Sequence, residues 1–151
     1  MPTLTLLHTN DLHGRLDQMT RLGTLVQRQR ALAAAEGRAV LLLDAGDSTD
    51  EAAWECRVNF AMLEAMGCDA AALGNTETQW DAAALEKLAA SVHFPVLAAN
   101  LFAAHSNQPP VPGVRAYAML TVAGVQVAVT GVTVDDPRLL RRAGYRSESG
   151  A

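Results

Sequence analysis

The sequence predicts an α/β fold built on a mixed, mostly parallel β-sheet, and three observations indicate it. Strand-like and helix-like segments alternate as βαβαβαβ from the N-terminus to about residue 100. The second strand-like segment is continuously apolar, which is typical of a strand covered on both faces. Beyond residue 105 the alternation stops, and two strand-like runs follow each other directly. Such alternation implies parallel strands joined by right-handed crossovers.

Four strands are expected in the alternating part. The first is β-prone and follows a proline, and the second is the apolar run. The third is short, and the fourth leads into a turn. In chain order they are residues 3–9 (TLTLLHT), 39–47 (AVLLLDAGD), 69–75 (DAAALGN) and 94–101 (FPVLAANL).

Three helices are expected between these strands, at residues 16–37, 55–67 and 81–92. Gly37 and Gly67 follow the first two as helix-ending residues, and Asp81 is a plausible N-cap of the third. Apolar spacing near the helical period predicts the buried face of each. In chain order these faces are Met19, Leu22, Leu25, Val26, Leu32 and Ala33; then Val58, Ala61, Met62, Ala65 and Met66; then Leu85, Leu88, Ala89 and Val92.

The rest of the chain has a different character. Residues 106–114 (SNQPPVPGV) hold three of the six prolines and are expected to form a loop. Residues 116–134 contain two strand-like runs that meet at Ala123 and Gly124. A short turn between two such runs predicts an antiparallel pair.

Length and composition limit the possible functions. The 151 residues, half of them hydrophobic, suffice for one domain that spans residues 1–151. A net charge of -4 and a pI near 5.5 argue against nucleic-acid binding. The apolar runs are too short for a membrane span, and the N-terminus lacks the pattern of a signal peptide. The chain as given is therefore expected to be cytoplasmic.

Two groups of residues are interpreted as structural. Cys56 and Cys68 lack the spacing of a zinc motif and are expected to be reduced and buried. The basic stretch RLLRRAGYR is interpreted as a solvated helix end, with an anion site as the less favoured alternative. Its arginines are Arg138, Arg141, Arg142 and Arg146.

Residues of metal-ligand type follow the predicted strands. Asp11 and His13 follow the first, Asp47 the second, Asn75 the third and Asn100 the fourth. Each alone is more often a turn residue, but ligands in parallel sheets bind beyond the carboxyl ends of the strands. Carboxylate and imidazole together suit a divalent metal. The set therefore predicts a shared metal site at this edge.

At this point the chain resembles the calcineurin-like metallophosphoesterases, and within them the 5'-nucleotidase branch. The resemblance is carried by LLHTNDLHGRL, LLLDAGDS, MGCDAAALGNTE, VLAANL and GVQVAVTGVTVDDP, in the family's order, over residues 4 to about 137. The resemblance implies an α-β-β-α sandwich of two mixed sheets, of which this chain is roughly the N-terminal half.

The resemblance also implies a function and a site. The function would be hydrolysis of a nucleotide or another phosphate ester by a metal-activated water. Two divalent ions (Mn, Zn, Fe or Co) would lie about 3.5–4 Å apart. Asp11 and His13 would hold the first ion, Asp47 would bridge both, and Asn75 would hold the second. Asn100 is a candidate for substrate binding.

The sequence departs from the family pattern after Asn75. The family places there a histidine that stabilises the phosphate or protonates the leaving group, whereas this chain has Thr76. The position of the aspartate that orients this histidine falls on Gln79, although a short shift would recruit Asp81. Thr76 is thus the candidate catalytic residue, but it lacks the imidazole's ability to donate a proton near neutral pH.

The second departure concerns three further histidine ligands, two of them in a G-H-x-H turn. The chain has four histidines and no such turn: His8, His13, His93 and His105. His93 is interpreted as a surface residue, His8 as a core or supporting residue, and His105 as doubtful. The full site would need ligands absent from this chain. The alternative is a catalytically impaired relative that binds metal or a partner; an unrelated doubly wound module is the least favoured reading.

Half of such a sandwich would leave one face of its sheet bare, because crossover helices cover only one side. Large exposed apolar patches are unusual on monomers. The chain is therefore expected to form a homodimer, or to pair with a complementary C-terminal half.

Overall fold

The computed structural model describes residues 2–49 and 53–148, with the side chains of residues 53–56 left out. Its main sheet is five-stranded and parallel, in the order β1-β2-β3-β4-β6. The strands are β1 (Leu4–Thr9), β2 (Ala39–Asp44), β3 (Ala70–Ala72), β4 (Val96–Leu97) and β6 (Val114–Arg115). The four strands expected in the alternating part are confirmed. The short β6 begins at the last residue of the segment expected to be a loop and was not predicted, because two residues are too few to leave a periodic pattern.

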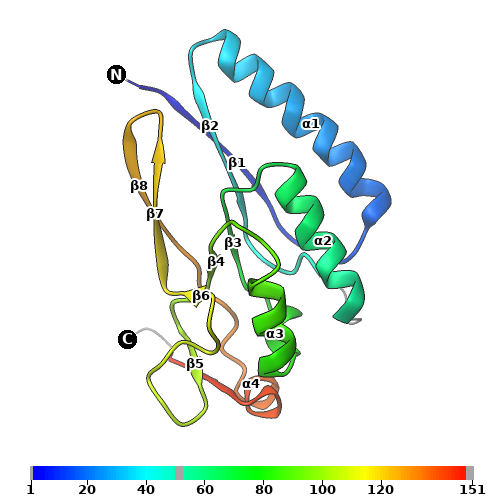
Figure 1. The fold of residues 1–151 in the computed structure, drawn as a ribbon, viewed down its shortest axis with the longest axis vertical. Coiled ribbons are helices and arrows are strands. Elements are labelled where there is room, and N and C mark those ends of the chain that lie inside the picture. Colours follow the sequence, from blue (N-terminus) through cyan, green and yellow to red (C-terminus); the bar gives the residue numbers. More distant parts are fainter. Residues whose placement is uncertain (1, 50–52, 149–151) are drawn as a thin grey trace.

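Three helices lie along one face of this sheet, as Figure 1 shows: α1 (Leu16–Ala35), α2 (Ala53–Ala65) and α3 (Ala82–Ala89). They enclose the larger core together with sheet residues such as Leu42, Ala71 and Val96. The crossovers thus place the carboxyl ends of the parallel strands at one edge of the sheet, where the candidate site residues follow.

The expected buried faces are right for α3 and only partly right for the other helices. Leu85, Leu88 and Ala89 are buried, and Val92 just beyond α3 packs on the core. In α1 only a narrow stripe is buried, Met19, Val26 and Ala33, with Leu22 packed beside it. Leu25 and Leu32 are 52% and 54% exposed, because α1 lies over the edge of the sheet.

The face expected for α2 is only partly right: Met62 and Met66 pack on the core, but the most buried residues lie elsewhere. The buried residues are Asn59, Phe60 and Leu63, whereas Val58 and Ala61 are exposed. Phe60 packs against Phe94 with ring centroids 5.8 Å apart. Because the apolar and polar residues of α2 are not separated onto opposite faces, periodicity could not choose a face. The face with the larger side chains is buried since it removes more apolar area from water.

The antiparallel pair is confirmed as β7 (Tyr117–Val122) and β8 (Val125–Thr130). Its turn residues, Ala123 and Gly124, both have positive φ, as a two-residue hairpin turn requires. Figure 1 shows this hairpin on the side of the sheet opposite the helices. Ala118 packs there with Ala70 and Leu97 in a second, smaller core. The second face of the sheet was expected to be bare, but the chain's own hairpin covers part of it.

Apolar side chains remain exposed around this hairpin. Leu6 is 59% exposed on β1, Met119 is 56% and Tyr117 62% exposed on β7, and Val132 is 68% exposed beyond β8. We therefore still expect the chain to self-associate at micromolar concentration, and light scattering measures this directly. A monodisperse species of 16.0 kDa would show that these side chains do not drive association.

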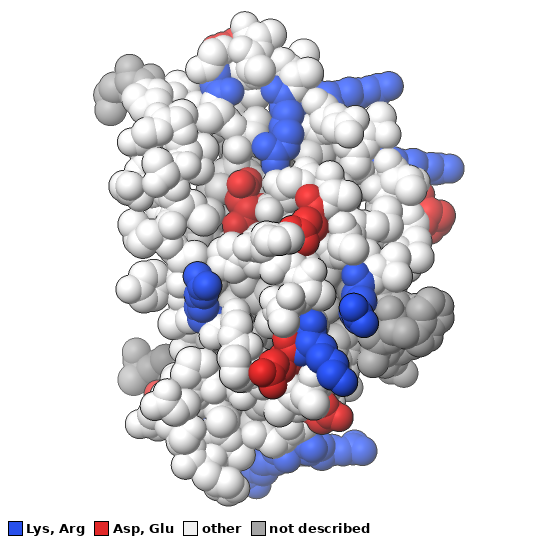
Figure 2. Space-filling model, viewed as in Figure 1, with Lys and Arg blue, Asp and Glu red and all other residues white. Residues whose placement is uncertain are grey.

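The C-terminal part closes the lower end of the molecule in Figure 1. Strand β5 (Leu101–Ala103) pairs antiparallel with β9 (Tyr145–Ser147), and α4 (Pro137–Ala143) precedes β9. Arg138, Arg141 and Arg142 are exposed on α4, as the interpretation of a solvated helix end requires. Arg146 lies over the ring of Phe102 and donates to the carbonyl of Ser106. Over the face drawn in Figure 2, basic and acidic side chains are interspersed.

Two remaining expectations concern cysteines and membranes. Cys68 is buried and free, and burial raises the pKa of its thiol to about 12. The side chain of Cys56 lies outside the described residues. Across the described ranges, none of the helices combines the length and the apolar character of a membrane span.

Candidate metal centre

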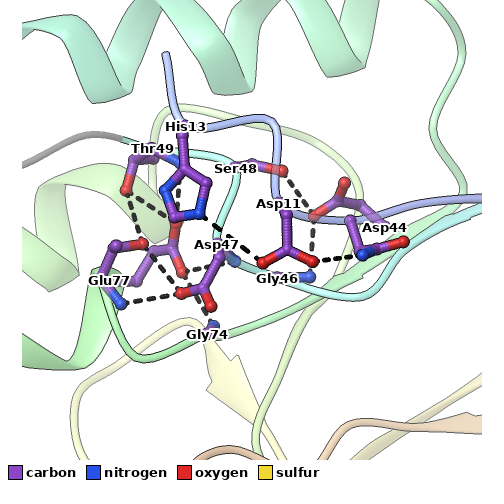
Figure 3. A network of polar contacts seen from close by, with 11 residues as sticks. Asp11, His13, Asp44, Gly46, Asp47, Ser48, Thr49, Gly74 and Glu77 are labelled. Atoms are coloured by element: carbon purple, nitrogen blue, oxygen red, sulfur yellow. Dashed lines mark hydrogen bonds and ion pairs between the residues drawn. The ribbon is translucent and has the colours of Figure 1, made fainter. Parts of the chain in front are cut away.

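The loops that follow β1 and β2 are joined by backbone hydrogen bonds beyond the ends of the strands. The N–H of Asp11 donates to the carbonyl of Gly46 at 3.0 Å, and that of His13 to the carbonyl of Asp47 at 3.1 Å. The N–H of Gly14 donates to the carbonyl of Ser48 at 3.3 Å. These bonds bring Asp11 and His13 beside Asp47, as Figure 3 shows.

All three of these candidate ligands have a left-handed backbone. The φ angles are 54° for Asp11, 43° for His13 and 53° for Asp47, and the only other described non-glycine residue of this kind is the turn residue Ala123. This conformation is unfavourable for non-glycine residues and concentrates at functional sites. The strain is thus gathered on the residues that sequence reasoning selected as metal ligands.

Asp11 and His13 converge, although not for the reason expected from the sequence. An extended chain would point both side chains the same way, but here the backbone turns at both residues. The ring Nε2 of His13 lies 3.6 Å from Oδ1 of Asp11, and both side chains are about half exposed. Asn10 also donates its amide to the Asp11 carboxylate. An imidazole and a carboxylate are therefore presented together to solvent.

Asp47 and Asn75 form the second convergent pair. The amide end of Asn75 faces the Asp47 carboxylate; with its nitrogen turned inward it would donate to Oδ2 at 2.7 Å and to Oδ1 at 3.3 Å. The two side chains therefore lie within hydrogen-bonding distance of each other, on the loops that follow β2 and β3.

Thr76 faces Asp47. Its backbone N–H and its hydroxyl both donate to Oδ1 of Asp47, at 2.9 and 3.1 Å. Thr76 thus orients the carboxylate proposed to bridge two ions. Its role as the candidate catalytic residue stays a prediction. Gln79 and Asp81, the candidates for orienting residue 76, make other contacts. Gln79 donates to the carbonyl of Asn75, and Asp81 caps α3 by accepting from the N–H of Ala84 at 2.8 Å.

Two glycines let the loops after β2 and β3 touch. A Cβ on Gly46 would lie 2.6 Å from the backbone nitrogen of Gly74. A Cβ on Gly74 would lie 2.2 Å from the nitrogen of Asp47 and 2.3 Å from its Oδ1. Distances under 3.0 Å essentially never occur for real Cβ atoms. The close approach of the Asp47 and Asn75 loops therefore depends on the absence of side chains at both positions.

Asn100 lies at the end of β4 but is bound to backbone. Its Nδ2 donates to the carbonyl of Thr133, and its Oδ1 accepts from the N–H of Thr133, both at 2.9 Å. This pair joins the turn after β4 to the segment after β8. The substrate-binding role suggested for Asn100 stays a prediction, and the structure gives it a structural role in addition.

Asp44, at the end of β2, is a buried carboxyl that organises the ligand loops. It accepts from the hydroxyls of Thr9 at 2.6 Å and Ser48 at 2.7 Å, and from the N–H of Gly46 at 3.0 Å. Burial raises its pKa from 3.8 to about 6, against the opposing effect of these hydrogen bonds. The buried Glu77 carboxylate adds a smaller upward shift in pKa.

This raised pKa predicts a pH dependence of stability. The folded state holds the Asp44 proton up to about pH 6, whereas the unfolded state releases it near 3.8. The contribution of the Asp44 carboxyl to the free energy of unfolding is therefore fully present below pH 3.8. It is lost as the pH rises through about 6, by at most about 3 kcal/mol. We expect Asp44→Asn to lack this decline. Urea denaturation of both proteins in chelator across this window measures it; parallel pH profiles would contradict the assignment.

Of the remaining histidines, His93 and His105 lie apart from these loops, and His8 lines a cavity with Asp44 and Ala45. His93 is exposed against Glu64, which confirms the surface interpretation, and His105 is exposed. His8 is exposed on β1. Its interpretation as a core residue is wrong, because β1 is the edge strand of the sheet, whereas the alternative of a supporting residue stays a prediction. Among the described residues, no three His, Cys, Asp or Glu side chains converge closely enough to hold an ion.

Glu77 is the residue that sequence reasoning missed. It follows Thr76 in the short helix η1 (Glu77–Gln79), is completely buried, and accepts four hydrogen bonds from the two loops that carry Asp47 and Asn75. A glutamate in a polar turn is usually solvated, so the sequence carried no signal of its burial.

Comparison with known proteins identifies relatives of this chain. The sequence model of the calcineurin-like phosphoesterases matches residues 4–147. A 5'-nucleotidase of Vibrio vulnificus is 35% identical over 144 residues, which cover 88% of this chain and 26% of that protein. A 5'-nucleotidase of Rattus norvegicus is 33% identical, with 93% and 28% covered. The chain thus spans about a quarter of the length of these relatives.

Solved structures show the same fold. The 5'-nucleotidase precursor of Thermus thermophilus matches with a TM-score of 0.76 at 22% identity, over 97% of this chain and 32% of that one. The NAD nucleotidase of Haemophilus influenzae matches with a TM-score of 0.78 at 19% identity, over 97% and 29%.

Proposed function

Because the chain belongs to the calcineurin-like phosphoesterases, we propose that it carries the N-terminal part of a divalent-metal site that hydrolyses phosphate esters, with nucleotides as the substrate class. One observation above all supports this: three candidate ligands with left-handed backbone, Asp11, His13 and Asp47, lie on loops joined by hydrogen bonds. The named 5'-nucleotidases among the relatives supply the substrate class.

The donor types fit such ions, although the ligand set is incomplete. Carboxylate, imidazole and amide oxygen suit Mn, Zn, Fe or Co. Asp11 and His13 would hold one ion, Asp47 would bridge, and Asn75 would hold the second. When bound, such ions lower the pKa of a coordinated water and neutralise charge on phosphate oxygens. The other ligands would come from a segment that this chain does not contain.

The residues of this chain have separable tasks in the proposed site. The Asp11–His13 pair presents a carboxylate and an imidazole at the solvent-exposed edge, where a phosphate can approach. Thr76 fixes the bridging carboxylate through two hydrogen bonds to its Oδ1. The backbone hydrogen bonds between the loops after β1 and β2 hold Asp11 and His13 beside Asp47.

The second candidate function is metal binding with little turnover, and Thr76 favours it. A threonine hydroxyl directed at Asp47 cannot act as a general acid for an alkoxide leaving group. Hydrolysis would then favour esters whose leaving groups need no proton. A screen that compares alkyl phosphates, such as nucleotides, with aryl phosphates separates the two functions.

Metal titration tests the proposed site. We expect the chain to bind Mn²⁺, and Asp47→Ala to lower the affinity by at least about 100-fold because it removes the ligand shared by both ions. Glu86→Ala, which removes an exposed carboxylate from α3, is the matched control and should bind as the wild type does. Equal affinity of the wild type and Asp47→Ala would remove Asp47 from the site and with it the proposed two-ion arrangement.

A further inference from the structure

The carboxylate of Glu77 connects two loops that come from different strands. Its Oε1 accepts from the N–H of Thr49 at 3.1 Å and from the hydroxyl of Thr49 at 2.7 Å. Its Oε2 accepts from the N–H of Gly74 at 2.8 Å and from that of Asp47 at 3.2 Å. Figure 3 shows Glu77 between the loop after β2 and the turn after β3. Each oxygen therefore has two donors, and three of the four donors are backbone.

The connection between these loops is reciprocal. Glu77 accepts from the backbone of Asp47, while the side chain of Asp47 accepts from the backbone and hydroxyl of Thr76, the neighbour of Glu77. Each loop thus supplies one carboxylate to the other. Neither loop can shift without breaking hydrogen bonds to the other loop. The positions of Asp47 and Asn75 are therefore linked through residues 76 and 77.

A buried carboxylate is expensive, and an apolar residue would fill the space at lower cost if packing were its only purpose. No arginine, lysine or histidine in the described part of the chain forms an ion pair with Glu77; its charge is met by the four donors alone. The left-handed backbone at Asp47 needs such external support, because it is unfavourable by itself.

We propose that Glu77 is a positioning residue for the metal centre: its carboxylate holds the Asp47 and Asn75 loops at the spacing that lets both side chains bind one ion. The part of this inference that concerns metal binding rests on the proposed function, whereas the role of Glu77 in holding the two loops together does not. Residues that support metal ligands typically change metal affinity by about 10–100-fold when substituted.

The test compares two variants by Mn²⁺ titration calorimetry and by amide hydrogen exchange in chelator. Glu77→Gln keeps the shape but turns an NH2 group toward donors that then lose their acceptor. Leu88→Ala, in the buried face of α3, destabilises the core at a distance from the loops and is the control for general loss of stability. Melting temperatures of both variants are measured alongside.

We expect Glu77→Gln to lower Mn²⁺ affinity by about 10–100-fold and to speed exchange at the amides of Asp47, Thr49 and Gly74. Leu88→Ala should lower the melting temperature with less than a twofold change in affinity. If the wild type binds Mn²⁺ and Glu77→Gln binds it equally well, the positioning role is overturned, whatever happens to stability.

Failure of the wild type to bind Mn²⁺ would instead overturn the proposed function. In that case the hydrogen-exchange measurement by itself tests whether Glu77 holds the two loops in place. Exchange at the three amides that is no faster in Glu77→Gln than in Leu88→Ala would overturn it, and selectively faster exchange would support it.

Discussion

Gly74→Ala is expected to abolish tight metal binding and to destabilise the fold. The new Cβ would lie 2.2 Å from the nitrogen of Asp47 and 2.3 Å from its Oδ1, so the Asp47 loop must move. Its other contacts oppose that movement, because the same loop is bonded to Glu77 and to the loop after β1. Overpacking of this kind costs about 1–3 kcal/mol or more. Displacing a ligand should lower Mn²⁺ affinity by about 100-fold.

A second glycine-to-alanine variant provides the control. In Gly23→Ala, within α1, the new Cβ would lie 3.5 Å from Cγ of Met66, an ordinary contact. Alanine is favoured over glycine inside a helix by up to about 1 kcal/mol, so stability should be unchanged or higher. Calorimetric titration with Mn²⁺ and urea denaturation are applied to both variants. Metal binding by Gly74→Ala at wild-type affinity would show that the contact between the two loops is not needed for the site.

Thr76→His is expected to raise turnover on alkyl phosphates by about 10²–10⁴-fold, the usual contribution of general acid catalysis. Aryl phosphates should gain much less, because their leaving groups depart without a proton. The backbone N–H of residue 76 still donates to Asp47 in this variant, so one of the two bonds that orient the carboxylate is kept. The measurement is the ratio of kcat/KM values for the two ester classes, in the metal-loaded protein.

Thr76→Val is the matched variant for this experiment. It keeps the shape of threonine and removes the hydroxyl that donates to Asp47, so it reports the effect of that bond alone. We expect it to change both ester classes equally. If Thr76→His gains on neither class while the protein hydrolyses aryl phosphate, residue 76 does not lie where an acid can reach the leaving group.

The candidate ligands could be selected from the sequence because the βα alternation has a simple physical consequence. Parallel strands end at one edge, so Asp11, Asp47 and Asn75 had to meet there whatever the details of packing. The motif resemblance then assigned individual roles to these residues. The same alternation located four strands of the sheet and the helices on one of its faces, and the Ala123–Gly124 turn predicted the hairpin.

Other features were decided only by tertiary packing. The buried face of α2 depended on which side chains could fill the space beside Phe94, and a helix whose apolar residues are spread around its axis cannot indicate this. The hairpin's position over the second face of the sheet was decided by contacts between residues far apart in sequence, Ala70, Leu97 and Ala118. Local periodicity carries no information about such long-range contacts.

What the sequence determined by itself is the order of the first four strands, the three helices between them and the hairpin, together with the residue types at the edge of the sheet, because these follow from local patterns along the chain. Tertiary structure alone decided how those types are held: the left-handed backbone of Asp11, His13 and Asp47, the contact between Gly46 and Gly74, and the burial of Glu77. Each of these depends on two or three loops that meet in space, and a carboxylate becomes a buried acceptor only when donors from both loops surround it.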